Sequence, residues 1–472
     1  MTEKIEIVNI PADVKVHRPE KRDEQNYNLR SRIYVRAVSG IHQLLRRRIG
    51  IVFLGLFALL PWIQYGDRQA ILLDLVNQEF NIFGLTLWPQ DLTLLASIFI
   101  IAAFALFFVT TFYGRVWCGY MCPQTVWTFM FIWFEEKIEG SANKRKKLDA
   151  MPLSFNKVWK KGLKHTAWWA VSLLTSLTFI GYFVPIDTLF IEFFTFNSSA
   201  MVVGWTLFFA ACTYGNAGWM REIMCLHMCP YSRFQSSMFD KDTFTVTYDT
   251  ARGEQRGPRS RKKDHKAMGL GDCIDCNLCV QVCPTGIDIR NGLQYECINC
   301  GACIDACDAT MEKMNYPKGL ISYTTEHSLE GKVTKVVRSK LFGYLTVLVV
   351  MLGAFAWQLS ARLPLEFNIE RDRNALFRET NEGLIENTFT LLIINKSQQD
   401  EVYFVDVQGL DNHTYIGQRE FEIKAGEALR AVISLAADPY DLSKPVTDIK
   451  IQVQTKDGET QVVQETRFFK GR

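Results

Sequence analysis

The chain has 472 residues, thirteen cysteines and a net charge of +3, and its mean hydropathy is close to zero. This length allows roughly three domains, and so small a charge gives no support to nucleic-acid binding. The near-zero hydropathy averages very apolar stretches with very polar ones, which is typical of a membrane protein with soluble parts.

Residues 1–46 are polar, carry both charge signs and are expected to form a cytoplasmic N-terminal tail. A cleavable signal peptide would place its apolar core just after a short basic region at the N-terminus. Here the first apolar run begins only at Ile49. We therefore expect this run to be a retained transmembrane helix.

Five apolar runs are long enough to cross a bilayer, which takes about 20 residues. One such run could be a buried helix of a soluble protein, but five in one chain disfavour that alternative. The runs are Ile49–Tyr65, Leu92–Tyr113, Thr166–Val184, Ala200–Met220 and Leu341–Leu359.

The distribution of Lys and Arg predicts the orientation, because cytoplasmic loops are enriched in both. Six arginines lie between Arg30 and Arg48, whereas the 66–91 loop contains only Arg68. The 144–164 loop is again basic, and the 185–199 loop has no basic residue. We expect a multi-pass protein of the bacterial inner membrane, with a cytoplasmic N-terminus and a periplasmic C-terminus.

Two cysteine pairs follow the second and fourth runs. Each has the pattern C-x-x-x-C-P with Met before the second cysteine, so the two form an internal repeat. Residues i and i+4 share a helix face, and the proline indicates that the helix restarts or kinks at the thiols. The pairs are Cys118 with Cys122 and Cys225 with Cys229.

Thiolates with nearby thioethers are soft ligands, which favour Cu(I), zinc or iron–sulfur groups. The alternative is that these residues only fill space in a helix interface. Because the pair is repeated, we predict one metal site built from all four cysteines. Met121 and Met228 are candidates for tuning it and His227 for an accessory ligand, whereas Cys212 is interpreted as a packed thiol.

The remaining eight cysteines form two copies of C-x-x-C-x-x-C-x-x-x-C, which is the spacing of bacterial two-cluster ferredoxins. In that pattern three close thiolates hold one 4Fe–4S cluster and the fourth holds the other. A disulfide framework or paired zinc knuckles would not explain the strict repeat. The predicted ligands are Cys273, Cys276, Cys279 and Cys307 for one cluster, and Cys297, Cys300, Cys303 and Cys283 for the second.

Residues 362–472 contain short β-rich runs separated by turn signals, which predicts a small immunoglobulin-type β-sandwich. The predicted strands are Asn387–Asn395, Glu401–Val407, Gln418–Lys424, Ala428–Ser434, Thr447–Gln454 and Gln461–Phe468. Nothing in this domain points to catalysis, so we interpret it as a docking or structural module. Elsewhere, no histidine lies within an apolar run, and no P-loop or dinucleotide fingerprint is present.

The chain resembles the FixG/CcoG family of membrane polyferredoxins, which are accessory proteins of cbb-type cytochrome c oxidases. The resemblance rests on both C-x-x-x-C-P pairs, on residues 283–290 and 294–298, on Cys307 followed by Asp308, and on residues 316–321. It implies reduction of Cu(II) to Cu(I) in the cytoplasm for delivery to the oxidase. Relatives that pass quinol electrons share the C-x-x-x-C-P repeat.

The sequence therefore predicts a multi-domain electron-transfer protein, an oxidoreductase with two 4Fe–4S clusters and a copper site. Its expected partners are membrane lipid, oxidase subunits or their copper-delivery factors, and a cytoplasmic electron donor. The alternatives are a quinol-linked electron relay and a redox-sensing assembly scaffold. The expected boundaries are a tail at 1–46, four spans at 47–230, a ferredoxin domain at 231–338, a fifth span at 339–361 and the β-sandwich at 362–472.

Overall fold

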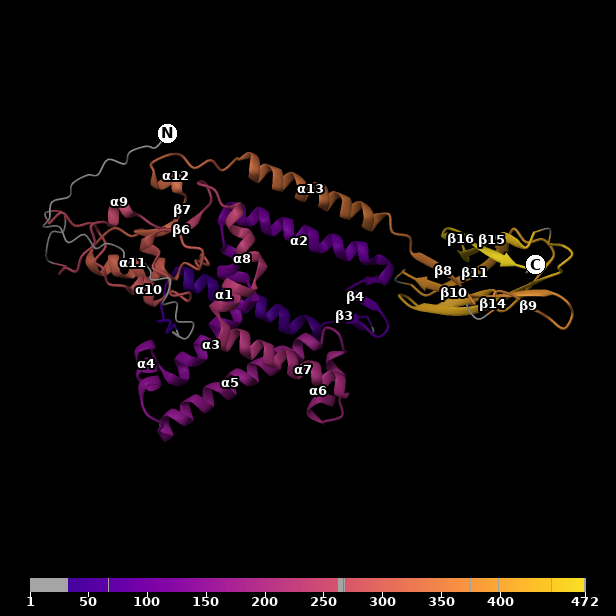
Figure 1. The fold of residues 1–472 in the computed structure, drawn as a ribbon, viewed down its shortest axis with the longest axis horizontal. Helices are drawn as coiled ribbons and strands as arrows, with labels where there is room; N and C mark the ends of the chain where they lie inside the picture. Colours follow the sequence, from indigo (N-terminus) through magenta and orange to yellow (C-terminus); the bar gives the residue numbers. More distant parts are fainter. Residues whose placement is uncertain are drawn as a thin grey trace. The chain divides into compact units, whose positions relative to one another are not determined.

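The computed structural model describes residues 33–470, apart from 67, 262–265, 267, 373–374, 398 and 443. Most of the predicted N-terminal tail therefore lies outside the described residues. The chain divides into two compact units (Figure 1). The first comprises residues 1–60, 102–181 and 186–348, and the second comprises residues 61–101, 182–185 and 349–472.

Helices make up most of the first unit. The longer ones are α1 (Ile41–Leu59), α2 (Leu92–Tyr113, which begins in the second unit), α3 (Pro123–Glu139), α4 (Ala142–Ala150), α5 (Phe155–Ile180), α6 (Ile186–Phe194), α7 (Ala200–Thr213), α11 (Ala302–Met314) and α13 (Ser339–Ser360, which ends in the second unit). The short ones are α8 (Pro230–Phe234), α9 (Thr250–Gly253), α10 (Leu278–Gln281) and α12 (Glu326–Leu329).

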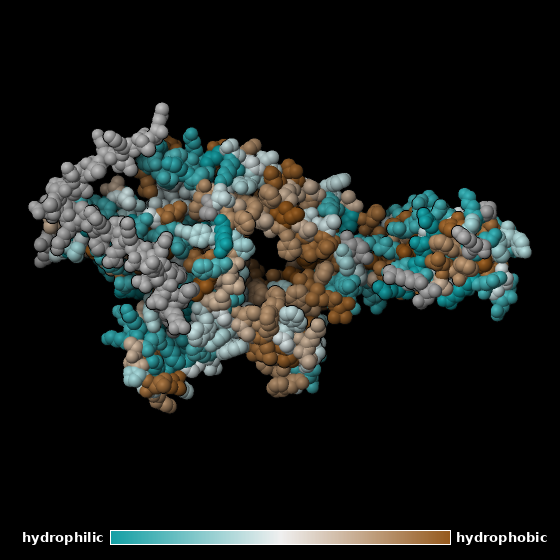
Figure 2. Space-filling model, in the orientation of Figure 1, coloured by the Kyte–Doolittle hydropathy of each residue, from teal (hydrophilic) through white to brown (hydrophobic). Residues whose placement is uncertain are grey.

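Two of the five predicted spans are helices long and apolar enough to cross a membrane, namely α2 and α13. The other three stay predictions. Helix α1 begins within the predicted tail and ends at Leu59, so the predicted first run is helical only in part. Figure 2 shows apolar surface over α6 and α7, where Phe196 and Met201 are exposed. Such a surface is expected of a segment that faces lipid or a partner.

Helix α5 packs against α3 and α7. Its Trp168 stacks on Phe131 with ring centroids 5.2 Å apart and donates a hydrogen bond to the Phe131 carbonyl. Two fully buried carboxylates of α3 are paired with cations: Glu135 with Arg145 and Arg221, and Glu139 with Lys161 and Lys164. Such pairing is required because a buried, unpaired charge would be strongly destabilising.

The ferredoxin stretch is bracketed by β6 (Thr245–Tyr248) and β7 (Ile321–Thr324), which pair antiparallel. Its core contains Val246, Ile304 and Met311 together with the cluster cysteines. Helix α11 begins after Gly301 and ends at Met314. The next residue, Asn315, adopts the left-handed conformation that commonly ends a helix.

The C-terminal domain is a β-sandwich of two antiparallel sheets (Figure 1). One sheet contains β12 (His413–Ile416), β14 (Ala428–Ala437), β10 (Ile385–Asn395) and β8 (Leu365–Arg371), with β9 (Arg378–Glu379) beside β10. The other contains β13 (Glu420–Ile423), β11 (Glu401–Gln408), β15 (Val446–Thr455) and β16 (Gln461–Phe469). Burial alternates along β10 and buries Phe389, Leu391 and Ile393 between the sheets.

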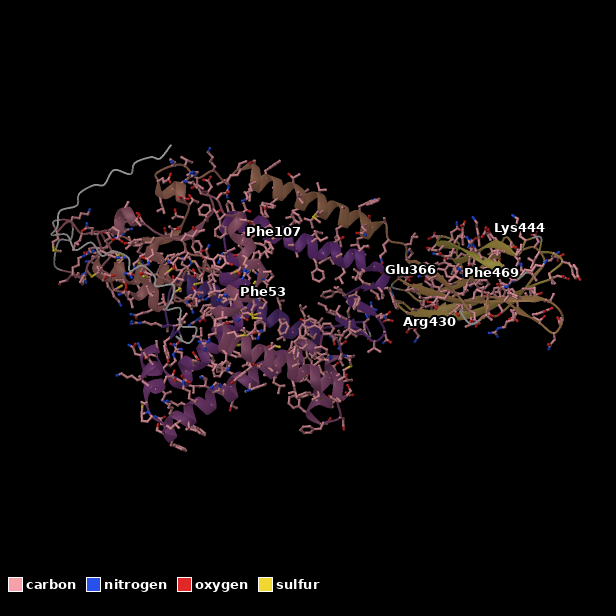
Figure 3. All side chains as sticks on the ribbon, in the orientation of Figure 1. Phe53, Phe107, Glu366, Arg430, Lys444 and Phe469 are labelled. Carbon is pink, nitrogen blue, oxygen red and sulfur yellow. The ribbon has the colours of Figure 1, made fainter. Side chains whose placement is uncertain are left out.

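The 61–91 segment also belongs to the second unit and forms β1 (Gln64–Tyr65), β2 (Arg68–Gln69), β3 (Ile71–Asp74), β4 (Glu79–Ile82) and β5 (Leu85–Leu87). Asp91, at its end, forms ion pairs with Arg362 and with Lys396 of the sandwich, at 2.7 and 2.9 Å. Lys396 also pairs with Glu366, which Figure 3 labels. These low-exposure ion pairs attach the segment to the β-sandwich.

Candidate metal centre

Each C-x-x-x-C-P pair occupies a widened helical turn. The first cysteine of each pair lies in a π-helical turn, η4 (Trp117–Met121) or η6 (Met224–Met228), and the second cysteine follows that turn directly. Helices α3 and α8 then begin at the prolines, where the missing N–H costs no helical hydrogen bond. The predicted restart at the prolines is present, and π turns of this kind are frequent at functional sites.

The four thiols of the two pairs lie within electrostatic reach of one another. Burial, and less strongly the thiols of Cys122 and Cys229, raise the pKa of Cys118 to about 11. Burial, followed by the other three thiols, raises the pKa of Cys225 to about 12. The thiols of Cys118 and Cys225 are therefore protonated at neutral pH, and a metal ion that binds them must displace their protons.

Within the described part of the chain, no three His, Cys, Asp or Glu side chains already converge on a single-ion site. Among the described residues, the predicted site of four cysteines is therefore not already assembled, and the thiols would have to draw together to share one metal ion. Their surroundings are only partly polar: the Gln235 side chain, itself fully buried, donates to the Cys118 sulfur at 3.2 Å. His227 and Met228 are exposed, unlike the half-buried thiols, so the structure does not place them as ligands.

The eight ferredoxin cysteines line two small cavities. One is lined by Cys273, Cys276, Cys279 and Cys307. The other is lined by Cys283, Cys297, Cys300 and Cys303, and also by Cys279, which lines both cavities. This is the grouping that the crossed ligand pattern predicts, so the residues fit two clusters, each held by four thiolates.

One of the two groups lies directly beside a thiol pair. The backbone of Gly119, between Cys118 and Cys122, lies against the loop between Cys297 and Cys300. A Cβ at Gly119 would be 2.7 Å from the Ile298 carbonyl oxygen and 2.9 Å from that of Asn299. We call the Cys283/297/300/303 group the proximal group and the Cys273/276/279/307 group the distal group.

A buried arginine links the same two regions. The Arg115 guanidinium donates to the carbonyls of Tyr295, Cys297 and Ser232, and it lies within electrostatic reach of the Cys118 thiol. Sequence reasoning missed both Arg115 and Gly119. The only available signal was their position within four residues of Cys118.

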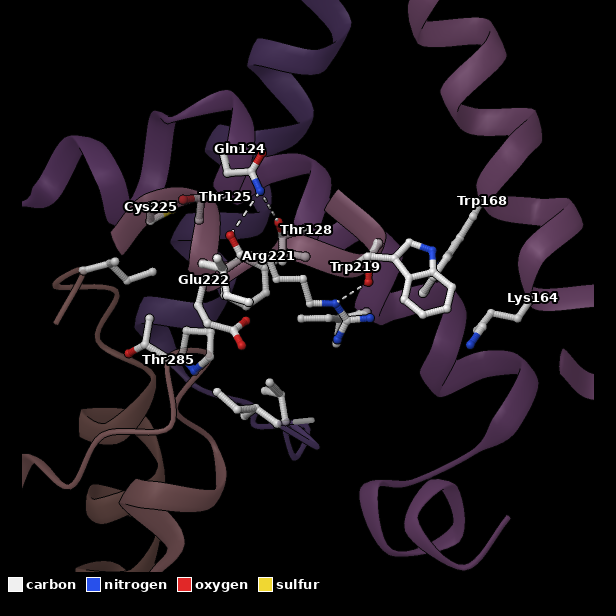
Figure 4. A pocket seen from close by; sticks show the side chains of 18 of the residues that line it. Gln124, Thr125, Thr128, Lys164, Trp168, Trp219, Arg221, Glu222, Cys225 and Thr285 are labelled. Atoms are coloured by element: carbon white, nitrogen blue, oxygen red, sulfur yellow. Dashed lines mark hydrogen bonds between the residues drawn. The ribbon is translucent and has the colours of Figure 1, made fainter. Parts of the chain in front are cut away.

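A cavity of about 530 Å³ adjoins the second pair (Figure 4). Its lining includes Cys225, Glu222, Trp168 and Trp219, together with Thr285 of the ferredoxin domain. Burial raises the pKa of the Glu222 carboxyl, whose side chain points into the cavity in Figure 4. Apolar walls with a few polar groups are typical of small-molecule sites.

Three family models match the chain. A "4Fe-4S dicluster domain" matches residues 220–326, a "4Fe-4S binding domain" matches residues 95–139, and the "IG-like fold at C-terminal of FixG" matches residues 355–471. The second of these ranges includes the first thiol pair.

Curated relatives match most of the chain. Protein RdxA of Cereibacter sphaeroides is 39% identical over 82% of this chain and 84% of its own length. The nitrogen fixation protein FixG of Rhizobium meliloti is 33% identical over 92% of this chain and 88% of its own. A crystal structure of a FixG-related protein from Vibrio parahaemolyticus is 39% identical, covering 23% of this chain and 96% of that one, with a TM-score of 0.22.

Proposed function

The chain belongs to the FixG family of iron–sulfur proteins, and from this premise we propose that it reduces Cu(II) to Cu(I) at its four membrane-surface thiols. The observation that carries the proposal is the contact of Gly119 with the proximal-group loop, which brings a thiol pair against a cluster-binding loop. When bound, the clusters supply single electrons. The Cu(I) product would serve assembly of a cbb-type cytochrome c oxidase.

The chemistry of the thiols suits this step. Copper takes up one electron as Cu(II) becomes Cu(I), and sulfur ligands favour the reduced ion. The half-buried, protonated thiols of Cys118 and Cys225 release protons as copper binds. The chain's own contribution is therefore to hold four soft ligands beside a one-electron donor.

We place the protein in the bacterial inner membrane with both cysteine regions on the cytoplasmic side, because the basic segments flank them. The reducing cytosol preserves free thiolates and oxygen-sensitive clusters. The β-sandwich would then lie in the periplasm, available to oxidase subunits or copper-delivery factors.

The test replaces one thiol pair at a time by serine in anaerobically purified, cluster-loaded protein. We expect Cys118→Ser with Cys122→Ser, and separately Cys225→Ser with Cys229→Ser, to abolish both copper binding and Cu(II) reduction while the iron content is unchanged. Cys212→Ser is the matched control and should behave as the unaltered protein. Half of the bound copper retained in each double variant would mean two independent sites, and full reduction in both would refute the proposal.

A quinol-linked relay is the second candidate, and the cavity beside Cys225 favours it. A quinol would lose two electrons, one to each cluster, and two protons, the first to a base such as Glu222 and the second to solvent water. The test is anaerobic addition of a short-chain quinol to oxidised protein while cluster reduction is followed spectroscopically. Reduction that Glu222→Gln slows would support the relay. A redox-sensing scaffold would show neither reduction of Cu(II) by its clusters nor reduction of its clusters by quinol.

A further inference from the structure

The proximal group is surrounded by buried positive charge. Arg46 and Arg115 are 7% and 5% exposed, and neither forms a salt bridge with any carboxylate in the described parts of the chain. Arg46 lies over the Phe129 ring at 3.5 Å and within electrostatic reach of Cys300. Arg115 donates to the Cys297 carbonyl and lies over the Tyr295 ring at 4.8 Å. Each has a buried guanidinium nitrogen without a hydrogen-bond partner.

One carboxylate, that of Asp305, lies nearby, but its charge is already offset. Asp305 accepts hydrogen bonds from the backbone N–H groups of His42 and Gln43, at the start of α1. The positive end of that helix dipole offsets the Asp305 charge. Two buried guanidiniums therefore need an anion that the side chains do not supply, and a thiolate-bound cluster carries such a charge.

The distal group has the opposite balance. Arg290 is neutralised by Asp275 and Asp288, at 2.5 and 2.6 Å, and Asp308 lies within electrostatic reach of Cys307. Arg259, which is half-buried, donates to the Cys273 carbonyl at 3.3 Å. The pairs Arg252–Asp272 and Arg256–Glu254 add equal numbers of positive and negative charges. The surroundings of the distal group therefore hold one carboxylate more than guanidiniums.

We infer that these charges set a potential gradient in which the proximal cluster has the higher reduction potential and electrons run from the distal to the proximal cluster. Positive charge stabilises the reduced, more negative form of a cluster, and net charge is one of the factors that set cluster potentials. Burial of the proximal cysteines works in the other direction, but unscreened charges at low dielectric act strongly. Each step moves one electron, and no proton or bond is exchanged.

This inference deepens the proposed function and rests on it, because it names the order of the carriers. Electrons would enter at the distal group, where Cys276 is exposed, and leave past Arg115 toward Cys118. A partner that donates electrons would therefore be an external one-electron donor that approaches the Cys276 side.

The test is a redox titration of both clusters, followed by electron paramagnetic resonance, in anaerobically purified full-length protein. We expect Arg115→Gln and Arg46→Gln each to move only the higher-potential signal downward. Arg115→Lys and Arg46→Lys keep the charge and should restore it. Arg36→Gln removes an exposed guanidinium and should move neither signal.

A second variant keeps the inference testable if the glutamine variants lose their clusters. Asp308 accepts a hydrogen bond from the Gly319 N–H, which asparagine can also accept, so Asp308→Asn removes only the charge. We expect it to raise the lower-potential signal. If it moves the higher-potential signal instead, or if the arginine variants move both signals equally or neither, the gradient is wrong. Absence of Cu(II) reduction would refute the proposed function and leave these potentials unaffected.

Discussion

Two carbonyl oxygens of the ferredoxin loop, those of Ile298 and Asn299, lie against Gly119 and leave no room there for a side chain. The obstacle is backbone, so no side chain can rotate away to relieve a clash. Any larger residue must push the loop and the thiol pair apart. Gly119 is therefore where the distance between the proximal group and the thiols is set.

We predict that Gly119→Ala slows electron delivery to the thiols several-fold, up to the roughly 100-fold that a misplacement of about 1 Å can cost a reaction. The measurement is the rate of Cu(II) reduction by pre-reduced protein, with iron content as the check on cluster loading. Gly162→Ala is the control, because a Cβ at that position meets nothing within 4 Å. Equal rates in the two variants would show that the close contact does not govern transfer.

At the scale of single elements, strand β10 ends at a buried polar residue. The Asn395 amide donates to the carbonyls of Gln399, Ile423 and Lys424, and its oxygen accepts from the Tyr403 hydroxyl. Asn395 thereby joins both sheets of the sandwich, and each of its buried groups is satisfied.

We expect Asn395→Ala to lower the free energy of unfolding of the β-sandwich by about 2 kcal/mol or more, because several buried groups lose their partner at once. Calorimetry of the full-length protein should resolve this as a lower transition temperature of that domain. Asn368→Ala, at a half-buried position of β8, should leave the transition nearly unchanged. A similar loss in both variants would contradict the argument.

The attachment of the 61–91 segment to the sandwich depends on pH, because it relies on the charge of Asp91. Burial by itself would raise the pKa of this carboxyl, but hydrogen bonds and charge from Lys396, the Trp88 N–H and Arg362 outweigh burial and hold it below its usual range. A lowered folded-state pKa contributes stability that is present above the unfolded pKa, about 4, and is lost as the pH falls through the folded value.

Asp91→Asn should therefore destabilise this unit at pH 7 by about 1–3 kcal/mol, and the difference from the unaltered protein should shrink below pH ~4. Thermal unfolding of metal-free protein across this pH range measures both. A difference that stays constant down to low pH would show that the charge of Asp91 contributes nothing.

The elements that sequence patterns predicted best are those with strong periodicity. All six predicted strands of the sandwich are present, whereas β8, β9 and β12 were missed. Strands β9 and β12 have only two and four residues, which carry little pattern. Helix α5 begins at Phe155 rather than near Thr166, because its basic first half was interpreted as a loop. The cysteine spacing predicts two groups, and the cysteines of each group line a common cavity, while their role as cluster ligands stays a prediction. The sequence alone could not predict the roles of Gly119, Arg46 and Arg115, because these roles depend on contacts between segments distant in the chain.

At the scale of the whole molecule, the number of membrane spans decides on which side of the membrane each loop lies. The segment 185–199, which contains α6, separates the alternatives. A reporter fused after Ser198 should indicate the periplasm if five helices cross the membrane. It should indicate the cytoplasm if only α2 and α13 do. Fusions after Met314 and Gly409 should indicate cytoplasm and periplasm in either case.

Two chain segments connect the ferredoxin domain to the rest of the first unit, and both are hydrogen-bonded to residues near the end of α2. Phe244, just before β6, donates its backbone N–H to the Phe112 carbonyl at 2.9 Å. On the other side, Arg338 donates to the Thr111 carbonyl, and β6 and β7 are paired with each other. A domain whose two connecting segments are both bonded to the end of one helix cannot move away from that helix as a mobile electron-carrier domain does. Its internal electron transfer should then be independent of solvent viscosity, whereas its encounter with a soluble donor should slow in proportion as sucrose is added.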